Sequence, residues 1–443
     1  GANNVAVGYD AMNANTTGAE NTAVGKVAMQ NNTTGGYNVA VGLLALEGNT
    51  TGSGNVALGK QALGANTTAS YNTAIGFQTL IANTTGTRNT AVGYHALDSN
   101  TTANNNVAVG YDSLQANTTG TGNSALGKDS LKATTTGTYN TALGVGALEV
   151  NTTASFNTAV GSLALLANTT GTQNVAVGKD ALKANTTASY NNAFGYQALM
   201  TQVADGVENN AFGTAALQMN TTGDHNSAFG NEALEENTTG RHNVGFGNYA
   251  LTNNTTADNN CAIGSSALGL NVTGANNIAI GKNAMYNNTT GANNVAVGYQ
   301  ALDSNTTGAD NTAVGRGALT RATTASYNTA FGNVALQNTT TGAANTAVGY
   351  LALEANTTGN ENVAMGDHAL DANTTAHYNT AIGTSTMGSN TTGANNVAVG
   401  RRALFVNTTG GSNTAVGYGT LDANTTGQLN TAVGYNALTA QNS

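Results

Sequence analysis

Residues 4–20 read Asn-Val-Ala-Val-Gly-Tyr-Asp-Ala-Met-Asn-Ala-Asn-Thr-Thr-Gly-Ala-Glu, and variants of this 17-residue unit fill the chain. The Gly that closes its Asn-x-Ala-apolar-Gly string lies at residues 8, 25, 42 and onward to 434. Every interval between these glycines is 17 residues long, except for 18 residues between Gly195 and Gly213. Twenty-six units and one extra residue account for all 443 residues, which predicts a single repeat array over 1–443. Because the chain lacks an initial Met and stops part-way through a unit, we expect it to be a window of a longer protein.

The composition excludes several classes of protein. Charged residues make up 8% of the chain, against about 25% in an ordinary domain, and the formal net charge is −9. This balance gives no attraction to nucleic acid or to an anionic membrane surface. No run of residues approaches the roughly 20 apolar residues of a membrane span, so we expect no direct membrane insertion of this window.

Each unit can be numbered from 1 to 17, starting at the Asn of the Asn-x-Ala-apolar-Gly string. Position 4 is apolar and position 9 is Leu or Met in all 26 units, while Ala holds position 3 in every unit except at Gly245. Adjacent strand residues face opposite sides, so non-polar residues at both positions 3 and 4 indicate that both faces of the strand are covered. We interpret positions 4 and 9 as the core columns, represented by Val7, Val24, Val41, Phe194, Phe212, Phe229 and Phe246 at position 4 and by Leu46 and Leu63 at position 9.

A 17-residue unit cannot bury an apolar face alone, but stacked units join their apolar positions into continuous columns. We therefore predict an all-β fold, a parallel β-solenoid (β-roll) of 26 stacked 17-residue coils, intertwined or packed as a homo-oligomeric fibre. Positions 1 to 5 predict one short strand per coil because they are rich in Val and Thr. The Asn-Thr-Thr-Gly segment predicts a turn, and the Ala-Leu segment at positions 8 and 9 fits either a second strand or one helical turn.

Two nine-residue stretches carry a resemblance to known families: Asn-Val-Ala-Val-Gly-Tyr-Asp-Ala-Met at 4–12 and Asn-Thr-Ala-Ile-Gly-Phe-Gln-Thr-Leu at 72–80. They resemble the head repeats of trimeric autotransporter adhesins, the shaft repeats of phage tail-fibre proteins and the arrays of very large bacterial surface filament proteins. The resemblance implies a parallel β-roll that is homo-oligomeric, usually trimeric, and that serves as an extracellular adhesive or spacing rod. The adhesin heads have a shorter repeat without Asn-Thr-Thr-Gly, so the subunit number does not transfer directly.

Position 6 carries Tyr in many units, and exposed Tyr is a common contact residue for glycans and proteins. The alternative is that these rings only cover gaps between coils or subunits. The candidate contact surface consists of Tyr9, Tyr94, Tyr111, Tyr196, Tyr299, Tyr350, Tyr418 and Tyr435.

Three interpretations fit the Asn-Thr-Thr at positions 12 to 14. The favoured one is a turn whose side chains bond to the backbone and to the same residue one coil away. Each Asn-Thr-Thr is also formally an N-glycosylation acceptor. An ice-binding array of Thr ranks is the third, although adjacent Thr residues would point to opposite sides of an extended strand.

The 18-residue interval is the singular feature of the array. Its turn lacks Asn-Thr-Thr and reads Met-Thr-Gln-Val-Ala-Asp-Gly-Val-Glu over residues 200–208, and four consecutive units around it have Phe at position 4. We predict a bulged coil or slight bend there, with a docking site as the alternative.

A few residue types could bind metals or react. His225 and His242 both occupy position 17 of successive units, which predicts stacking within about 5 Å, with Asp224 nearby. Two histidines are only a weak metal signal. Glu232, Glu235 and Glu236 leave calcium open, but they lack a calcium-binding loop. Cys261 occupies a Thr/Val position and needs no redox role. No cofactor is predicted.

The sequence contains no nucleophile, base and orienting group in a recognisable set, so we predict that the chain is not an enzyme. We expect the structural shaft of a long extracellular adhesive filament, which mediates attachment to or capture of other cells or surfaces. The alternatives are a phage tail-fibre or adhesin receptor-binding region that recognises surface glycans, and an ice-binding array. The expected partners are further copies of the chain, with a trimer favoured, and glycans or proteins of a target cell. The expected location is extracellular or at the cell surface, with a virion tail as the alternative.

Overall fold

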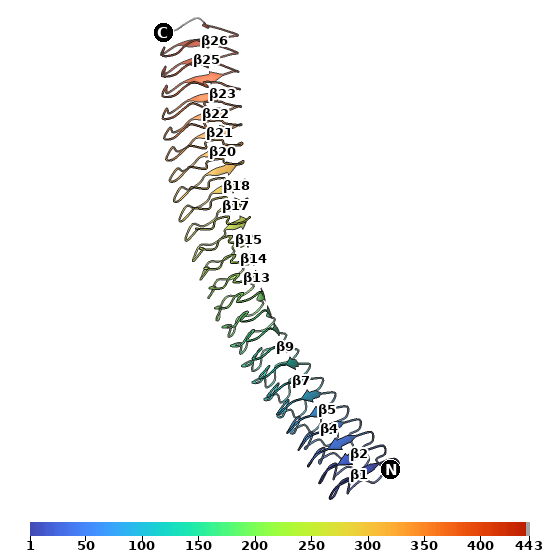
Figure 1. Ribbon diagram of the computed structural model, residues 1–443. Helices are drawn as coiled ribbons and strands as arrows, with labels where there is room; N and C mark the ends of the chain where they lie inside the picture. The colour runs from blue at the N-terminus through green and yellow to red at the C-terminus, as the bar shows by residue number, and fades with distance from the viewer. Residues whose placement is uncertain (440–443) are drawn as a thin grey trace. The chain divides into compact units, whose positions relative to one another are not determined.

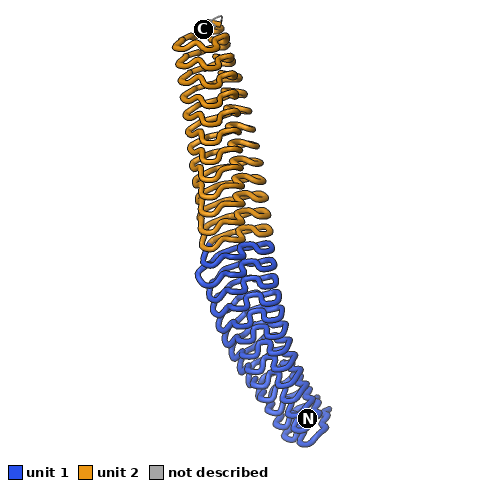
Figure 2. The backbone as a smooth tube through the Cα atoms, turned by 60° about the vertical axis from the view of Figure 1, so that its left-hand side comes forward, with its two compact units in different colours: residues 1–224 blue, residues 225–443 orange. Residues whose placement is uncertain are grey.

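The computed structural model describes residues 1–439, and the chain divides into two compact units, Gly1–Asp224 and His225–Ser443 (Figure 2). Each unit is a stack of similar coils, and no helix occurs within residues 1–439. The described residues accordingly contain no helix long and apolar enough to cross a membrane.

Every coil contains one strand of three residues, at positions 2 to 4 of the 17-residue repeat (Figure 1). From here on, the first unit and the second unit are the two compact units of the chain. The strands of the first unit are β1 (Val5–Val7), β2 (Thr22–Val24), β3 (Val39–Val41), β4 (Val56–Leu58), β5 (Thr73–Ile75), β6 (Thr90–Val92), β7 (Val107–Val109), β8 (Ser124–Leu126), β9 (Thr141–Leu143), β10 (Thr158–Val160), β11 (Val175–Val177), β12 (Asn192–Phe194) and β13 (Asn210–Phe212). Those of the second unit are β14 (Ser227–Phe229), β15 (Val244–Phe246), β16 (Cys261–Ile263), β17 (Ile278–Ile280), β18 (Val295–Val297), β19 (Thr312–Val314), β20 (Thr329–Phe331), β21 (Thr346–Val348), β22 (Val363–Met365), β23 (Thr380–Ile382), β24 (Val397–Val399), β25 (Thr414–Val416) and β26 (Thr431–Val433).

Within each unit, successive strands pair in parallel and in register. In the first unit Ala23 pairs with Ala40, and in the second Ala296 pairs with Ala313. Equivalent positions therefore align coil after coil. The predicted all-β parallel β-solenoid, with 26 parallel strands and about 17 residues per turn, is confirmed.

The Ala-Leu segment is neither a second strand nor a helical turn, so both expectations for it were wrong. It is a turn in which positions 7 and 9 have positive φ, as at Leu44 (59°) and Leu46 (54°). This left-handed conformation is unfavourable for leucine, because it brings the Cβ close to the following carbonyl oxygen. Hydrogen bonds to both neighbouring coils hold it in place: Leu44 N donates to the carbonyl of Lys26 at 3.1 Å and Leu46 N to that of Ala62 at 2.9 Å.

The interior of a coil is small and half polar. In the coil that begins at Asn38, the side chains of Ala40, Ala45, Leu46 and Asn49 are buried together with that of Asn38, all at 0% exposure. Position 9 is thus a core column as predicted, at Leu46 and likewise at Leu63. Position 3, always Ala or Gly, supplies the strand's contribution to the core.

The prediction that position 4 lies in the core is wrong for this structure. Val7 is 56% exposed, Val41 38% and Phe246 55%, and the remaining predicted members are half-buried: Val24, Phe194, Phe212 and Phe229. Adjacent strand residues face opposite sides, and apolar character alone does not say which of them faces inward. The interior already holds Leu, Ala and two Asn side chains, so it admits only Ala from the strand, and the larger residue points outward.

The Gly at position 5 ends each strand and is required there. These glycines have φ between 128° and 149°, a conformation that side chains disfavour. A Cβ on Gly59 would also overlap the backbone of Gly76 in the next coil. The 17-residue spacing of this glycine therefore has two physical causes.

Candidate functional site

The outward face of the strands is an uncharged surface on which the apolar position-4 side chains line up. We define the outward face as the side chains at positions 2 and 4, because position 3 points into the coil. No strand contains a charged residue, and position 4 is Val, Leu, Ile, Phe or Met throughout. In the first unit this face contains a shallow hollow of about 320 Å³, lined mainly by Val107, Val109, Leu126 and Leu143.

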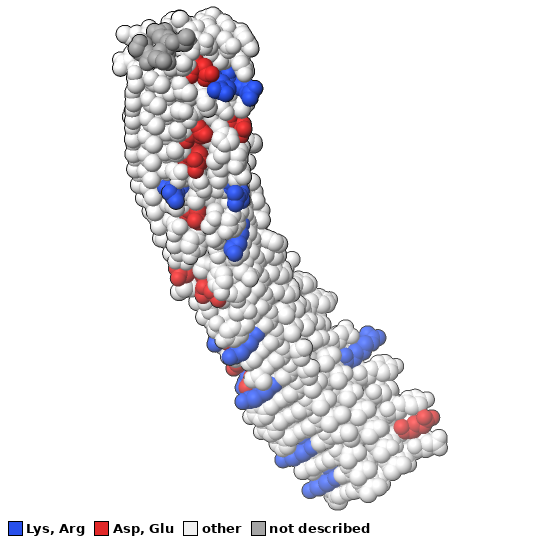
Figure 3. Space-filling model, turned by 45° about the horizontal axis from the view of Figure 1, so that its top comes forward, with Lys and Arg blue, Asp and Glu red and all other residues white. Residues whose placement is uncertain are grey.

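Charged residues are sparse on the rest of the surface. Figure 3 shows Lys, Arg, Asp and Glu as isolated side chains or small groups on an otherwise uncharged exterior. The densest cluster described in the first unit centres on Lys132, whose Nζ lies 2.9 Å from Asp129 and 3.0 Å from Asp112. These two carboxylates raise the pKa of Lys132, so the ammonium stays charged and paired.

Phenylalanines at position 4 stack on the outward face. The rings of Phe194 and Phe212 lie 4.7 Å apart and within 8° of parallel, while those of Phe229 and Phe246 are 5.6 Å apart and tilted by 31°. The parallel register places these larger rings side by side outside the coil, where they do not strain its small interior.

The eight predicted contact tyrosines at position 6 are all exposed, from 41% at Tyr418 to 76% at Tyr435. Several stack on aromatic rings of neighbouring coils, as Tyr94 does on Phe77 of the preceding coil at 5.3 Å and on Tyr111 of the following coil at 5.2 Å. Stacking covers the ring faces and leaves the edges and hydroxyl groups for solvent. Basic side chains cover further faces, including Lys26 over Tyr9, Lys179 over Tyr196 and Arg401 over Tyr418.

The Asn of Asn-Thr-Thr forms the predicted ladder between coils. Asn49 Nδ2 donates to Oδ1 of Asn32 at 2.8 Å and to the carbonyl of Gly52 at 3.0 Å. A second ladder runs through position 1, where Asn38 N donates to Oδ1 of Asn21 at 3.0 Å. Both ladders are buried, so a glycan cannot reach these amides in the folded coil.

The two Thr columns differ, as expected for adjacent residues. The hydroxyl of Thr33 donates to the carbonyl of Thr50 in the next coil at 2.9 Å, whereas Thr34 is exposed. Only one Thr column therefore faces solvent freely, and it does not form the paired rank that the ice-binding alternative requires.

The extra residue of the 18-residue interval lies in the turn, as a bulged coil requires. Strand pairing continues across it, with Phe194 opposite Phe212. Gln202 replaces the usual buried Asn and is itself fully buried. Its Oε1 accepts hydrogen bonds from Asn209 at 3.3 Å and from Asn220 at 3.2 Å, so the ladder continues toward the later coil. Toward the earlier coil it is interrupted, because Nε2 of Gln202 and Oδ1 of Asn185 are both buried without a hydrogen-bond partner.

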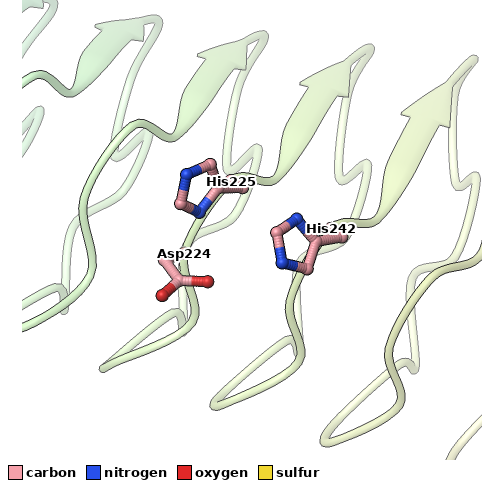
Figure 4. A group of neighbouring side chains, drawn as sticks. All are labelled: Asp224, His225 and His242. Atoms are coloured by element: carbon pink, nitrogen blue, oxygen red, sulfur yellow. The ribbon is translucent and has the colours of Figure 1, made fainter.

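The candidate metal ligands fall into two groups. His225 and His242 stack as predicted, with ring centroids 4.9 Å apart, and one ligand atom each of these histidines and of Asp224 lies within 4.8 Å of the others (Figure 4). Within residues 1–439 this is the single group of three such residues. Glu235 does not belong to a group of three candidate metal ligands. Burial and the charges of its acidic neighbours raise the pKa of its carboxyl.

Cys261 is half-buried in β16, in the Thr/Val column where the sequence places it. Burial raises the pKa of its thiol, which lowers the fraction of reactive thiolate. The structure gives this cysteine the surroundings of a small strand residue.

No protein-family model matches the chain, and no curated protein matches it. The repeat, the register and the closed coils identify it as a β-solenoid repeat protein.

Proposed function

We propose that the chain is part of the structural shaft of a long extracellular filament that attaches its bearer to other cells or surfaces, or captures them. One observation carries the proposal: each unit stacks coils that are hydrogen-bonded to their neighbours around most of their circumference, and leaves an uncharged apolar column along its outward face.

The hydrogen bonds suit a load-bearing rod. Around one coil, backbone donors at Val39, Leu46, Thr50 and Gly54 all bond to neighbouring coils, at 2.8 to 3.0 Å. The Asn ladders add further bonds inside the coil. Pulling two coils apart breaks all of these bonds together, so each coil resists separation far better than a single contact would.

The outward face suits packing between copies of the chain. Strands lie about 4.8 Å apart, so the thirteen strands of one unit extend over roughly 60 Å. A face about 10 Å wide then offers about 600 Å² per copy, and two copies would bury about 1,200 Å², which reaches the size of stable interfaces. A strip of this size is at the upper end of the largest apolar patches that monomeric proteins expose, and such patches often mark interaction sites. We therefore propose a homo-oligomer, with the trimer favoured by the resemblance to trimeric adhesin repeats.

A second candidate function is recognition of surface glycans by the position-6 tyrosines, as in a phage tail-fibre or adhesin receptor-binding region. The exposure of the tyrosine edges and hydroxyl groups favours it. The stacking of their faces points to a packing role instead. Ice binding gains no support, because the Thr33 column bonds to the next coil and only the Thr34 column is exposed, so no paired Thr rank forms.

The oligomer is tested by light scattering of the 443-residue chain during gel filtration. We expect a multimer for the wild type, a monomer for Leu126→Arg combined with Leu143→Arg, and a multimer for Thr136→Arg, an exposed control on the turn. A wild type that stays monomeric at tens of micromolar contradicts the proposal.

The location is tested by antibody labelling and cryo-electron tomography of the producing sample. Filaments rooted in a cell envelope support the proposed shaft, whereas label on virion tails supports the receptor-binding alternative.

A further inference from the structure

We propose that His225 and His242, together with Asp224, bind one divalent transition-metal cation that clips two successive coils together. The site is independent of the proposed function, since it requires only this chain and the ion. His225 precedes β14 and His242 precedes β15, so an ion bound by both joins two successive coils.

The ligand set suits a borderline metal ion. Imidazole nitrogens and a carboxylate oxygen are the ligands that Zn²⁺ takes in proteins, at about 2.0 to 2.2 Å. Two nitrogens bound to one ion must lie about 3 to 4 Å apart, and the ligand atoms here lie within 4.8 Å of one another. Both histidines are exposed, so small side-chain rotations can bring the nitrogens together.

The backbone holds the two histidines in matching positions. Both have left-handed φ, 57° at His225 and 56° at His242. Each is followed by a fully buried Asn, and Asn243 N donates to Oδ1 of Asn226 at 3.0 Å. The coil spacing therefore fixes the separation of the two histidines before any ion binds, and only the side chains must adjust.

Ring stacking at position 17 is not specific to this pair, because Tyr139 and Phe156 stack in the same way at 5.5 Å. What distinguishes the pair is its ligand atoms and the adjacent carboxylate. The positive charge of Arg241, next to His242, opposes cation binding. Asp258 one coil later, whose Oδ1 accepts from the backbone N of Arg241 at 2.7 Å, adds a negative charge nearby. We therefore expect micromolar affinity instead of the much tighter binding of enclosed zinc sites.

Titration of the 443-residue chain with Zn²⁺ by calorimetry, and with Co²⁺ by visible absorption, tests the site. We expect one ion per chain, weaker binding by at least about tenfold in His225→Ala and in His242→Ala, and a smaller loss in Asp224→Asn. The imidazoles must be unprotonated to bind, so affinity falls as the pH is lowered. Zn²⁺ should raise the unfolding temperature of the wild type and leave that of His242→Ala unchanged.

The control is His368→Gln, which removes a histidine 3.1 Å from Asp367 but without a second histidine beside it. It should bind Zn²⁺ as the wild type does. No saturable binding at millimolar Zn²⁺, or equal affinity in a variant that lacks both His225 and His242, overturns the site. Ca²⁺ binding as tight as Zn²⁺ binding overturns the transition-metal assignment, because imidazole is a poor ligand for Ca²⁺.

Discussion

The side-chain amide of Asn49 donates a 2.8 Å hydrogen bond to Oδ1 of Asn32, the residue at the same position one coil earlier. In turn, Oδ1 of Asn49 accepts from the amide of Asn66, one coil later, at 2.9 Å. One buried side chain thus connects three coils, and the same amide also satisfies the carbonyl of Gly52.

Replacing Asn49 with Leu should lower the local stability by about 2 to 4 kcal/mol, because it leaves buried polar groups on both neighbouring coils without hydrogen-bond partners. Asn49→Thr should cost only about 1 kcal/mol, since a hydroxyl can still accept, as Thr134 accepts from Asn151 at 3.2 Å. Hydrogen exchange of the backbone amides in the surrounding coils measures both. Unchanged protection in Asn49→Leu would show that the ladder does not hold the coils.

Two glycines of one coil provide a matched test of the strand end. Gly59 has φ of 136° and no room for a Cβ, whereas Gly64 has ordinary space around it. We expect Gly59→Ala to destabilise the coil by more than about 2 kcal/mol. Gly64→Ala should be neutral or stabilise by up to about 1 kcal/mol, through a less flexible unfolded chain. Urea unfolding of the two variants measures the difference, and equal effects would contradict the assigned roles.

The two faces of β8 can be separated by substitution. Ala125 is 1% exposed and Leu126 is 48% exposed. Ala125→Leu should overpack the interior and cost about 1 to 3 kcal/mol. Leu126→Ala should cost less than about 1 kcal/mol at concentrations where the chain is monomeric, and it should weaken self-association. Thermal unfolding at low protein concentration measures the loss of stability in each variant, and gel filtration measures the self-association of Leu126→Ala. If Leu126→Ala lost more stability than Ala125→Leu, position 4 and not position 3 would be the core position of the strand.

The repeat length, one short strand per coil within positions 1 to 5 and the Asn-Thr-Thr turn could all be predicted from the sequence, because each depends on local preference repeated in register. The inward side of the strand could not. Ala125 and Leu126 are both apolar, and only the volume left beside Leu131 in the closed coil decides which of them fits.

The conformation of the Ala-Leu turn could not be predicted from the sequence either. Local preference disfavours positive φ at residues such as Leu46, and the bonds that impose it come from residues 16 or more positions away, such as Ala62. At the candidate metal site the sequence predicted the stacking of His225 and His242. It also placed Asp224 near them, because Asp224 precedes His225 in the chain, and the ligand atoms of all three lie within 4.8 Å of one another.

Asp303 provides a test of pH dependence. Burial raises the pKa of its carboxyl, and its Oδ1 is buried without a hydrogen-bond partner. A carboxyl whose pKa is higher in the folded state opposes folding when it is ionised. Its unfavourable contribution decreases as the pH falls through the folded-state pKa and disappears below the unfolded-state pKa.

Asp303→Asn should therefore stabilise the coil at neutral pH by less than about 1 kcal/mol, since the group is partly screened by solvent. The gain should vanish in acid. Asp310→Asn, at an exposed position of the same coil, is the control and should have little effect at either pH. Urea unfolding at pH 7 and pH 3.5 measures both variants, and a gain that grows in acid contradicts the assigned sign.

Tyr94 distinguishes packing from recognition at position 6. Its ring stacks between Phe77 and Tyr111 at 5.3 and 5.2 Å, nearly parallel to both, while 42% of the residue remains exposed. Tyr94→Ala removes both stacking contacts and should cost about 1 to 3 kcal/mol. Tyr94→Phe keeps the ring and should change stability by less than about 0.5 kcal/mol. A packing role therefore predicts that Tyr94→Phe combined with Tyr111→Phe leaves both the unfolding curve and cell binding unchanged. If the exposed hydroxyl groups bind glycans, the same double variant loses cell binding at unchanged stability, because only the hydroxyl groups have been removed.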